Sequence, residues 1–576
     1  MRRLAPVFAG LVAAAASCAT SAAADPPVAT ASAELVKLPA AVPSVAEPVS
    51  LARFRDHLAT LASDAFDGRK PGTRGGKLAT NYIKQQFQKL GLRPGNHGAW
   101  LQSVPTVQIT LANTDTALAI ATKSGVDKLA YRDDMIVNNL SGKAAVELTN
   151  SPVVFAGYGV AAPEQDWNDY AGIDVRGKTV IVLVNDPGFG NNDASLFKGR
   201  AMTYYGRWTY KFEEAARHGA AACFIVHDDA GAGYAWSVVQ SSWSGPQFDL
   251  PAPNDPAPRL DVAGWLSTAA ARRLFSDAGA DFDTLRAGAD RRGFKPIELP
   301  AHAAIRLRST IRRGQSDNVV ALLPGQDRPG EVLVYSAHWD HLGRDNSLQG
   351  DKIYNGAVDN ATGVAALLAI AEAYTRQQPA PRRSVLFVAL TLEESGLLGS
   401  KFYAAHPAFA ASDTVADINM DAMYLLGRAH NMSIVGYGQS ELDAVLERAL
   451  GAQGRYVSAE EAPEKGHFFR SDHFNFARMG IPALYAKSGL DLLDGGEAAG
   501  RAAVDEYTSR RYHKPGDEFH DDQRLDGVIE DAQALYAVGR ELAQSGAWPQ
   551  WAADSEFRAV RDAQHEATPR SAHAAK

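Results

Sequence analysis

The stretch EVLVYSAHWDHLG (331–343) begins the pattern that decides the fold of the C-terminal half of the chain. Its apolar run is rich in β-branched residues and predicts a buried strand, which ends where polar residues follow. ATGVAALLAIAEAYTR (361–376) then predicts a helix, and RRSVLFVALTLEES (382–395) predicts the next strand. The alternation continues in three further segments: VADINMDAM (415–423), ELDAVLERALG (441–451) and GIPALYAKSG (480–489). Crossover units of this length predict an α/β fold with a mainly parallel mixed sheet and helices on both faces.

Polar residues gather at the ends of these strands. In open sheets of this kind, functional groups lie beyond the carboxyl ends of the strands. Seven candidates follow a strand directly or lie in a loop between elements: His338, Asp340, Asp359, Glu393, Glu394, Asp421 and His513. A single carboxylate in such a place is explained as well by helix capping. The agreement of five elements favours a functional site.

The chemistry of this set points to metal ions. Two histidines and several carboxylates, with no cysteine, suit divalent cations such as zinc. Three carboxylates, Asp359, Glu394 and Asp421, together with one hydroxide would balance the four charges of two dications, as a buried site requires. In the adjacent pair Glu393–Glu394, one glutamate can bind metal while the other takes a proton from water. We therefore predict a hydrolytic centre with two metals.

Six motifs carry a resemblance to a known family, in the family's order: HWDHLG (338–343), NGAVDNATGVAAL (355–367), LEESGLLGS (392–400), INMDAM (418–423), SDHFNFARMGIPAL (471–484) and YHKPGDEF (512–519). Together they resemble family 28 of the metallopeptidases, the two-zinc aminopeptidases and their relatives. The resemblance implies the zinc exopeptidase fold. It also implies two Zn²⁺ ions per chain, with other divalent ions as alternatives.

The resemblance also implies a role for each residue. His338 and Asp421 would bind one zinc, Glu394 and His513 would bind the other, and Asp359 would bridge them.

Glu393 would be the general base for a water that the metals bridge. Asp340 would orient the His338 ring without binding metal itself. Tyr512 resembles a tyrosine that polarises the substrate carbonyl in some relatives, although a packing role explains it equally well. Three other motif residues are assigned no catalytic role: His341, Asp472 and His473.

A separate region interrupts the peptidase pattern. Buried strands are predicted at 151–160, 177–186 and 220–228, with a helix at 209–219. RWTYKFEEAARHGAAACFIVHD (207–228) resembles a protease-associated domain, a β-rich module that either narrows the cleft or only stabilises the enzyme. Within it, Cys223 is expected to be a buried core thiol. The predicted organisation is a signal peptide (1–24), a linker (25–47), an N-terminal peptidase part (48–140), the insert (141–305), the catalytic domain (306–548) and a tail (549–576).

The first residues predict export. MRRLAPVFAGLVAAAASCATSAAADPP (1–27) has a basic head, a short apolar stretch and a small-residue cleavage site, as secretory signal peptides do. A periplasmic or secreted protein is therefore expected, with lipid anchoring through Cys18 as a minor alternative. No later stretch predicts a membrane span. The net charge of −8 and the lack of a basic run disfavour nucleic acid as a partner.

The sequence thus predicts an exported zinc-dependent exopeptidase that acts on peptide substrates, and most simply an aminopeptidase. A carboxypeptidase or dipeptidase on the same scaffold is one alternative, and it would need cationic groups for the substrate carboxylate. A glutaminyl-cyclase-like acyltransferase with a single zinc is another. A binding module that has lost its metals is disfavoured, because all five metal-ligand candidates are present. The oligomeric state stays open.

Overall fold

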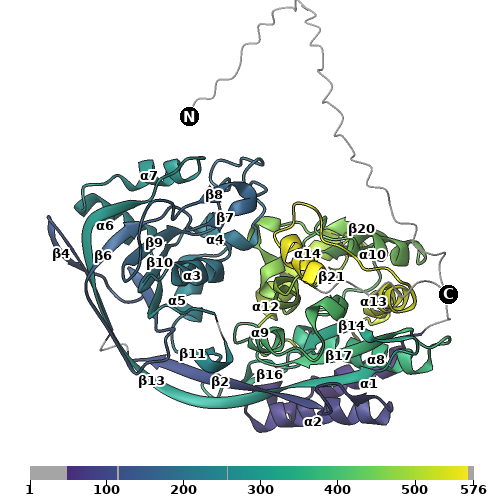
Figure 1. Cartoon of the computed structure of the whole chain (residues 1–576). Helices are drawn as coiled ribbons and strands as arrows, with labels where there is room; N and C mark the ends of the chain where they lie inside the picture. Colours follow the sequence, from purple (N-terminus) through teal and green to yellow (C-terminus); the bar gives the residue numbers. More distant parts are fainter. Residues whose placement is uncertain (1–47, 113–115, 256, 568–576) are drawn as a thin grey trace, which may run out of the picture. The chain divides into compact units, whose positions relative to one another are not determined.

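The computed structural model describes residues 48–112, 116–255 and 257–567 (Figure 1). The predicted signal peptide, Cys18 and the predicted linker lie outside these residues. Within them, no helix is both long enough and apolar enough to cross a bilayer.

A mixed sheet forms the centre of the C-terminal half. Its middle strands are parallel and run in the order β17 (Arg383–Leu390), β14 (Arg328–His338), β18 (Thr414–Asn419) and β21 (Ala483–Ser488). On one side β13 (Ile297–Leu323) pairs antiparallel with β17. On the other side β19 (Asn431–Ile434) is antiparallel to β21 and parallel to β20 (Tyr456–Ala459). The predicted mainly parallel mixed sheet is confirmed.

Helices cover both faces of this sheet. Successive side chains of a strand point to opposite faces. Accordingly, Leu333 and Tyr335 of β14 belong to a different hydrophobic cluster from Val332 and Val334. The first face packs on α1 (Leu51–Leu61), α2 (Arg74–Lys89), α8 (Thr362–Arg376), α10 (Leu442–Gly451) and α13 (Asp526–Gln544). The second packs on α9 (Leu398–Ala405) and α11 (His473–Arg478).

The predicted insert and the residues just before it are built around a second sheet. β6 (Ala145–Phe155), β9 (Thr179–Leu183), β10 (Ala222–Val226) and β12 (Val262–Leu266) are parallel, and β5 (Met135–Asn138) closes one edge antiparallel. These strands confirm the three buried runs expected from the sequence. Cys223 is fully buried in β10, as expected of a core thiol, and burial raises the pKa of its thiol. The helices of this part are α3 (Trp208–Arg217), α4 (Asp229–Ala232), α5 (Trp236–Ser242), α6 (Thr268–Asp277) and α7 (Phe282–Ala289).

One strand, β13, belongs to both sheets (Figure 1). Its first part pairs with β6 and with β3 (Ala117–Thr122), which also pairs with β4 (Gly125–Lys128). Its middle pairs with β2 (Leu101–Leu111), and β2 also pairs with β11 (Pro246–Asp249). The sequence itself indicates a strand only in the last part of β13, at VVALLPG (319–325). The expected limit between insert and catalytic domain, at 305/306, falls inside β13, and the domain limits stay a prediction.

Within the predicted tail, the described residues 549–567 include buried side chains. Trp551 and Phe557 are buried in a cluster with Phe468 and Phe474, and α14 (Arg558–Ala567) follows. The aromatic side chains explain the packing, because they bury large apolar areas.

Candidate metal centre

Each candidate ligand comes from the end of an element that packs in the central sheet or next to it. His338 is the last residue of β14, and Asp421 follows β18. Glu393 and Glu394 follow β17, and Asp359 lies in the turn before α8. His513 follows α12 (Gly496–Arg510). The strand ends bring these residues to one edge of the sheet, where an open α/β sheet places its functional groups.

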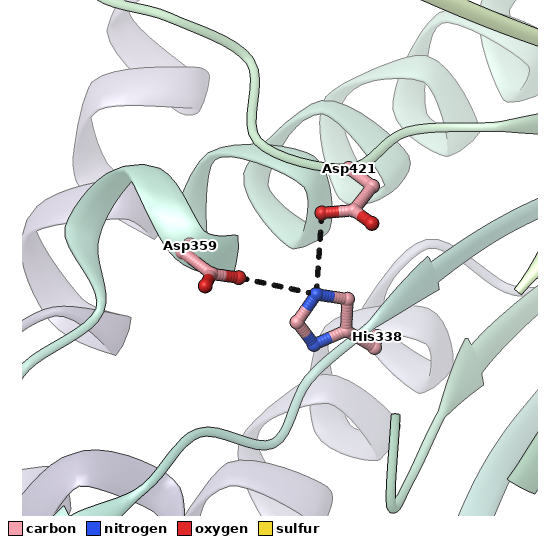
Figure 2. Close-up of side chains that lie close together, drawn as sticks. All are labelled: His338, Asp359 and Asp421. Atoms are coloured by element: carbon pink, nitrogen blue, oxygen red, sulfur yellow. Dashed lines mark hydrogen bonds and ion pairs between the residues drawn. The ribbon is translucent and has the colours of Figure 1, made fainter. Parts of the chain in front are cut away.

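Three of these side chains form a first cluster (Figure 2). Nε2 of His338 lies 3.3 Å from Oδ1 of Asp359 and 3.3 Å from Oδ1 of Asp421. All three residues are buried. One imidazole nitrogen and two carboxylate oxygens converge here within the distance range that a shared cation would need.

A second cluster lies on the other side of Asp359. Nε2 of His513 is 3.1 Å from Oδ2 of Asp359 and 3.1 Å from Oε2 of Glu394. Asp359 thus presents Oδ1 to the first cluster and Oδ2 to the second. A carboxylate placed in this way can join two cations.

The electrostatics of the two clusters favour cations. Burial acts to raise the pKa of Asp359, but hydrogen bonds from His338 and His513 outweigh it and hold that pKa well below its usual range. Burial acts to lower the pKa of His513, and Glu394 and Asp359 raise it to about 11. For His338, Glu393 and Asp421 likewise overcome burial and raise the pKa well above its usual value. An environment that draws protons onto the buried His338 ring and the partly exposed His513 ring has the charge and the donor types that a pair of divalent ions requires.

His341 joins the second cluster, although the sequence assigned it no role. Its Nδ1 lies 2.5 Å from Oε1 of Glu394 and 3.9 Å from Oδ2 of Asp359, and its ring is buried. Together with His513 it holds the pKa of Glu394 at about 2, against burial and the charge of Asp359. The sequence signal was present in HWDHLG, where His341 lies three residues after His338. Both His341 and His513 thus contact Asp359 and Glu394.

Asp340 contacts both His338 and Glu393. Nδ1 of His338 is 3.1 Å from the backbone carbonyl of Asp340 and 3.9 Å from its Oδ1. Oδ1 instead accepts a hydrogen bond of 3.1 Å from the backbone N–H of Glu393. Burial raises the pKa of Asp340 to about 7. The residue therefore holds the His338 ring through its main chain and the Glu393 backbone through its side chain.

Asp517 and Arg69 hold the loops that carry the ligands, and sequence reasoning missed both. The buried Asp517 carboxylate accepts hydrogen bonds of 3.0 Å from the backbone N–H groups of Val358 and Asp359. The buried Arg69 guanidinium donates to four backbone carbonyls: Leu61, Trp339, Asn355 and Gly356. Arg69 lies in the glycine-rich loop after α1 and was not recognised as part of the site.

The backbone at three site positions adopts the left-handed region. Leu392, Ala422 and His513 have φ values of 58°, 53° and 55°. Side chains other than glycine seldom adopt this conformation, and such strain gathers at functional sites. Leu392 immediately precedes the Glu393–Glu394 pair, so the turn there redirects the chain as it leaves β17.

Glu393 and Tyr512 lie on the wall of a cavity of about 670 Å³. The Glu393 carboxylate makes no hydrogen bond or ion pair with another of the described residues, and burial raises its pKa well above the usual value. The Tyr512 ring stacks on His513 with centroids 4.0 Å apart, and 42% of the residue is exposed. His341, Glu394 and His513 line the same cavity. So do side chains of the insert, among them Trp208 and Trp243.

Comparison with known proteins finds one matching family and several relatives. The family model described as Peptidase family M28 matches residues 318–536. A "Probable zinc metalloprotease" of Pyricularia oryzae is 28% identical over 233 residues, which are 37% of this chain and 44% of that protein. "Leupeptin-inactivating enzyme 1" of Streptomyces exfoliatus is 29% identical over 175 residues, 30% of this chain and 36% of that enzyme. The chain thus spans less than half the length of these curated relatives.

Among solved structures, an aminopeptidase from Aneurinibacillus sp. strain AM-1 is 18% identical, with a TM-score of 0.46 over 87% of this chain and 96% of that one. The segment that the family model matches holds all the candidates named above from His338 to His513. Residues 318–536 therefore match the model of peptidase family M28.

Proposed function

We propose that this chain is an exported zinc-dependent exopeptidase, and specifically an aminopeptidase. The observation that carries the proposal is the position of Asp359, whose two oxygens face two separate clusters of nitrogen and oxygen ligands. Zinc is supported by this donor set and by the name of the relative from Pyricularia oryzae. Export rests on the predicted signal peptide.

The donor set fits two ions. His338 and Asp421 would hold one, Glu394 and His513 the other, and Asp359 would bridge them. His341 is a further candidate at the second position, since it contacts both carboxylates there. When bound, the ions supply Lewis acidity that lowers the pKa of the attacking water and polarises the substrate carbonyl.

Glu393 is the proposed general base. Its carboxylate faces the cavity without a partner among the described residues, so it is available to a water molecule. It takes a proton as the C–O bond forms and gives it to the leaving amine as the C–N bond breaks. Asp340 supports this role by holding the Glu393 backbone. Tyr512 is proposed to donate a hydrogen bond to the substrate carbonyl, since its exposed ring lies beside His513.

Glu393→Gln tests the mechanism. The amide cannot accept the proton, so kcat on leucine p-nitroanilide should fall by about 100- to 10,000-fold, while two zinc ions per chain remain. Glu541→Gln is the matched control, because Glu541 pairs with Arg448 and contacts none of the candidate ligands. Wild-type turnover in Glu393→Gln would remove Glu393 from the mechanism.

Zinc-loaded wild-type protein tests the two alternative functions, the carboxypeptidase or dipeptidase and the acyltransferase. Hydrolysis of an amino-blocked peptide without hydrolysis of the free-amine anilide would contradict an aminopeptidase and favour a carboxypeptidase. About one zinc per chain, together with pyroglutamate formation from a glutaminyl peptide, would favour the acyltransferase.

A further inference from the structure

A sharp turn leads from β17 to α9 and carries Glu393. Two of its residues other than glycine adopt the left-handed region, Leu392 with a φ of 58° and Leu397 with a φ of 60°. The Leu398 N–H closes the turn by donating to the Leu392 carbonyl at 3.0 Å. Strained backbone of this kind persists only where its surroundings hold it in place. The position of the Glu393 carboxylate therefore depends on what packs against the turn.

The first support of the turn is Asn318 of β13. Its Oδ1 accepts a hydrogen bond of 3.0 Å from the Thr391 N–H, and its Nδ2 donates one of 3.0 Å to the Gly399 carbonyl. Asn318 is fully buried. One side chain of the strand that joins the two sheets thus fixes the chain both before and after Glu393.

The second support comes from the insert. Leu250 follows β11 and is fully buried. It belongs to one apolar cluster with Leu392 and Leu398 of the turn, together with Val104 of β2 and Phe402 of α9. β11 is itself fixed by its antiparallel pairing with β2. Leu250 is not among the described residues that line the cavity, so its contacts are with the turn rather than with a substrate.

Charged side chains join the same two segments. Nζ of Lys401, in α9, lies 2.7 Å from Oδ2 of Asp255 and 3.5 Å from Oδ1 of Asp249. Arg259 pairs with both carboxylates as well, at 2.8 Å from Asp255 and 3.2 Å from Asp249. Burial acts to lower the pKa of Lys401, and Asp249 and Asp255 outweigh it and raise that pKa. Because the two cations and two carboxylates balance, removing one of them would leave a half-buried charge without its partner.

We propose that the insert positions the general base, because Leu250 and Asp255 hold the turn of residues 391–399 and this turn holds Glu393 at the cavity. The inference rests on the proposed peptidase function. Leu250, Asp255 and Lys401 are positioning residues, which act through Glu393 and not on the substrate. The insert thereby has a part in the chemical step, beyond narrowing the cleft or stabilising the enzyme.

Leu250→Ala tests the apolar support. The zinc-loaded variant should lose about 10- to 100-fold in kcat on leucine p-nitroanilide, with KM within about twofold, because a small displacement of a catalytic group suffices for such a loss. Leu250→Met keeps most of the volume and should retain at least about half of kcat. Leu274→Ala is the matched control, since Leu274 is buried in α6 of the insert and belongs to a different apolar cluster. Equal losses in Leu250→Ala and Leu274→Ala would overturn the inference.

Lys401→Met tests the charged support. It should lower kcat about 10-fold at unchanged KM, whereas Lys401→Arg keeps the cation and should restore at least about half of the wild-type value. Lys178→Met is the control: Lys178 is as exposed as Lys401 and pairs with Glu298, at 2.5 Å, within the insert. Unchanged kcat in Lys401→Met, or an equal loss in Lys178→Met, would contradict the proposed role of the ion pairs.

A double variant separates positioning from a general structural role. Once Glu393→Gln has removed the carboxylate, adding Leu250→Ala should lower kcat by no more than about twofold, because residues that act through one group are not additive. The same 10- to 100-fold loss with and without the Glu393 carboxylate would overturn the inference. So would a raised KM at unchanged kcat, which would assign Leu250 to substrate binding.

Hydrogen exchange of the zinc-loaded full chain provides a readout that is independent of catalysis. Leu250→Ala should speed amide exchange within residues 392–399 by about 10-fold or more, since the Leu398 N–H bond closes the turn. Leu274→Ala should leave these residues unchanged. Unaltered exchange in Leu250→Ala would overturn the inference even if kcat falls. Failure of wild-type protein to cleave any substrate would refute the proposed function instead, and the exchange rates would still decide whether the insert holds the turn.

Discussion

Replacing Asp517 by Asn should weaken metal binding although Asp517 is not itself a candidate ligand. Its two carboxylate oxygens each accept one backbone N–H, from Val358 and from Asp359, at 3.0 Å. An amide offers one acceptor and points an NH₂ group at the other N–H, so one charge-assisted hydrogen bond is lost. Such a bond contributes about 1.5–3 kcal/mol, and the orphaned donor is buried. The turn that positions Asp359 should shift as a result.

The expected magnitude is a 10- to 100-fold loss of zinc affinity, roughly the effect of removing groups that orient metal ligands. Competition with a chromophoric chelator measures it, and saturating zinc should restore most of kcat. Asp531→Asn is the control: Asp531 is equally buried but accepts hydrogen bonds from Arg455 and Ser488, away from the candidate ligands. Unchanged zinc affinity in Asp517→Asn, or an equal loss in Asp531→Asn, would refute the reasoning.

Two further predictions concern metal content and acid stability. Asp359→Ala should lose both metals, whereas His341→Ala should lose at most one, because His341 contacts only the second cluster. Elemental analysis after dialysis distinguishes one ion per chain from two. Equal metal contents in the two variants would contradict the bridging role of Asp359. Burial, helped by Arg53, lowers the pKa of His57 from 6.5 to about 4. As the pH falls, His57 is therefore protonated in the unfolded chain before it is protonated in the folded chain. The contribution of His57 to the free energy of unfolding is fully present above pH 6.5, and about 3 kcal/mol of it is lost as the pH falls towards 4. Urea unfolding of metal-free protein should show this loss relative to His57→Phe, and parallel pH profiles would contradict it.

The sequence predicted those parts of the site that follow from local patterns. Buried apolar runs such as 332–337 predict parallel strands. The residue that follows each run must then lie at the carboxyl edge of the sheet. His338, Glu394 and Asp421 could therefore be assigned to one edge from periodicity alone. His513 could not, since it follows a helix, and its position depended on the resemblance.

The rest of the site depends on contacts between distant segments. Arg69 reaches Gly356 across 287 positions, and nothing in its local sequence distinguishes it from a surface arginine. Asp517 lies in a quoted motif, but its bonds to the turn at Asp359 depend on how α12 and α8 pack. The part of β13 before residue 319 was missed because its alternation of small and charged residues is weakly apolar.

That strand has a mechanical consequence. β13 spans 27 residues, roughly 90 Å of extended chain, and pairs with strands of both sheets; its register shifts only where it pairs with β6. A hinge between the sheets would need flexible residues at the junction, but here the junction is itself a paired ladder with β2. The insert and the catalytic part should therefore unfold in one cooperative transition. Substrate would then enter through movement of side chains and loops at the cavity rather than by one domain swinging away from the other.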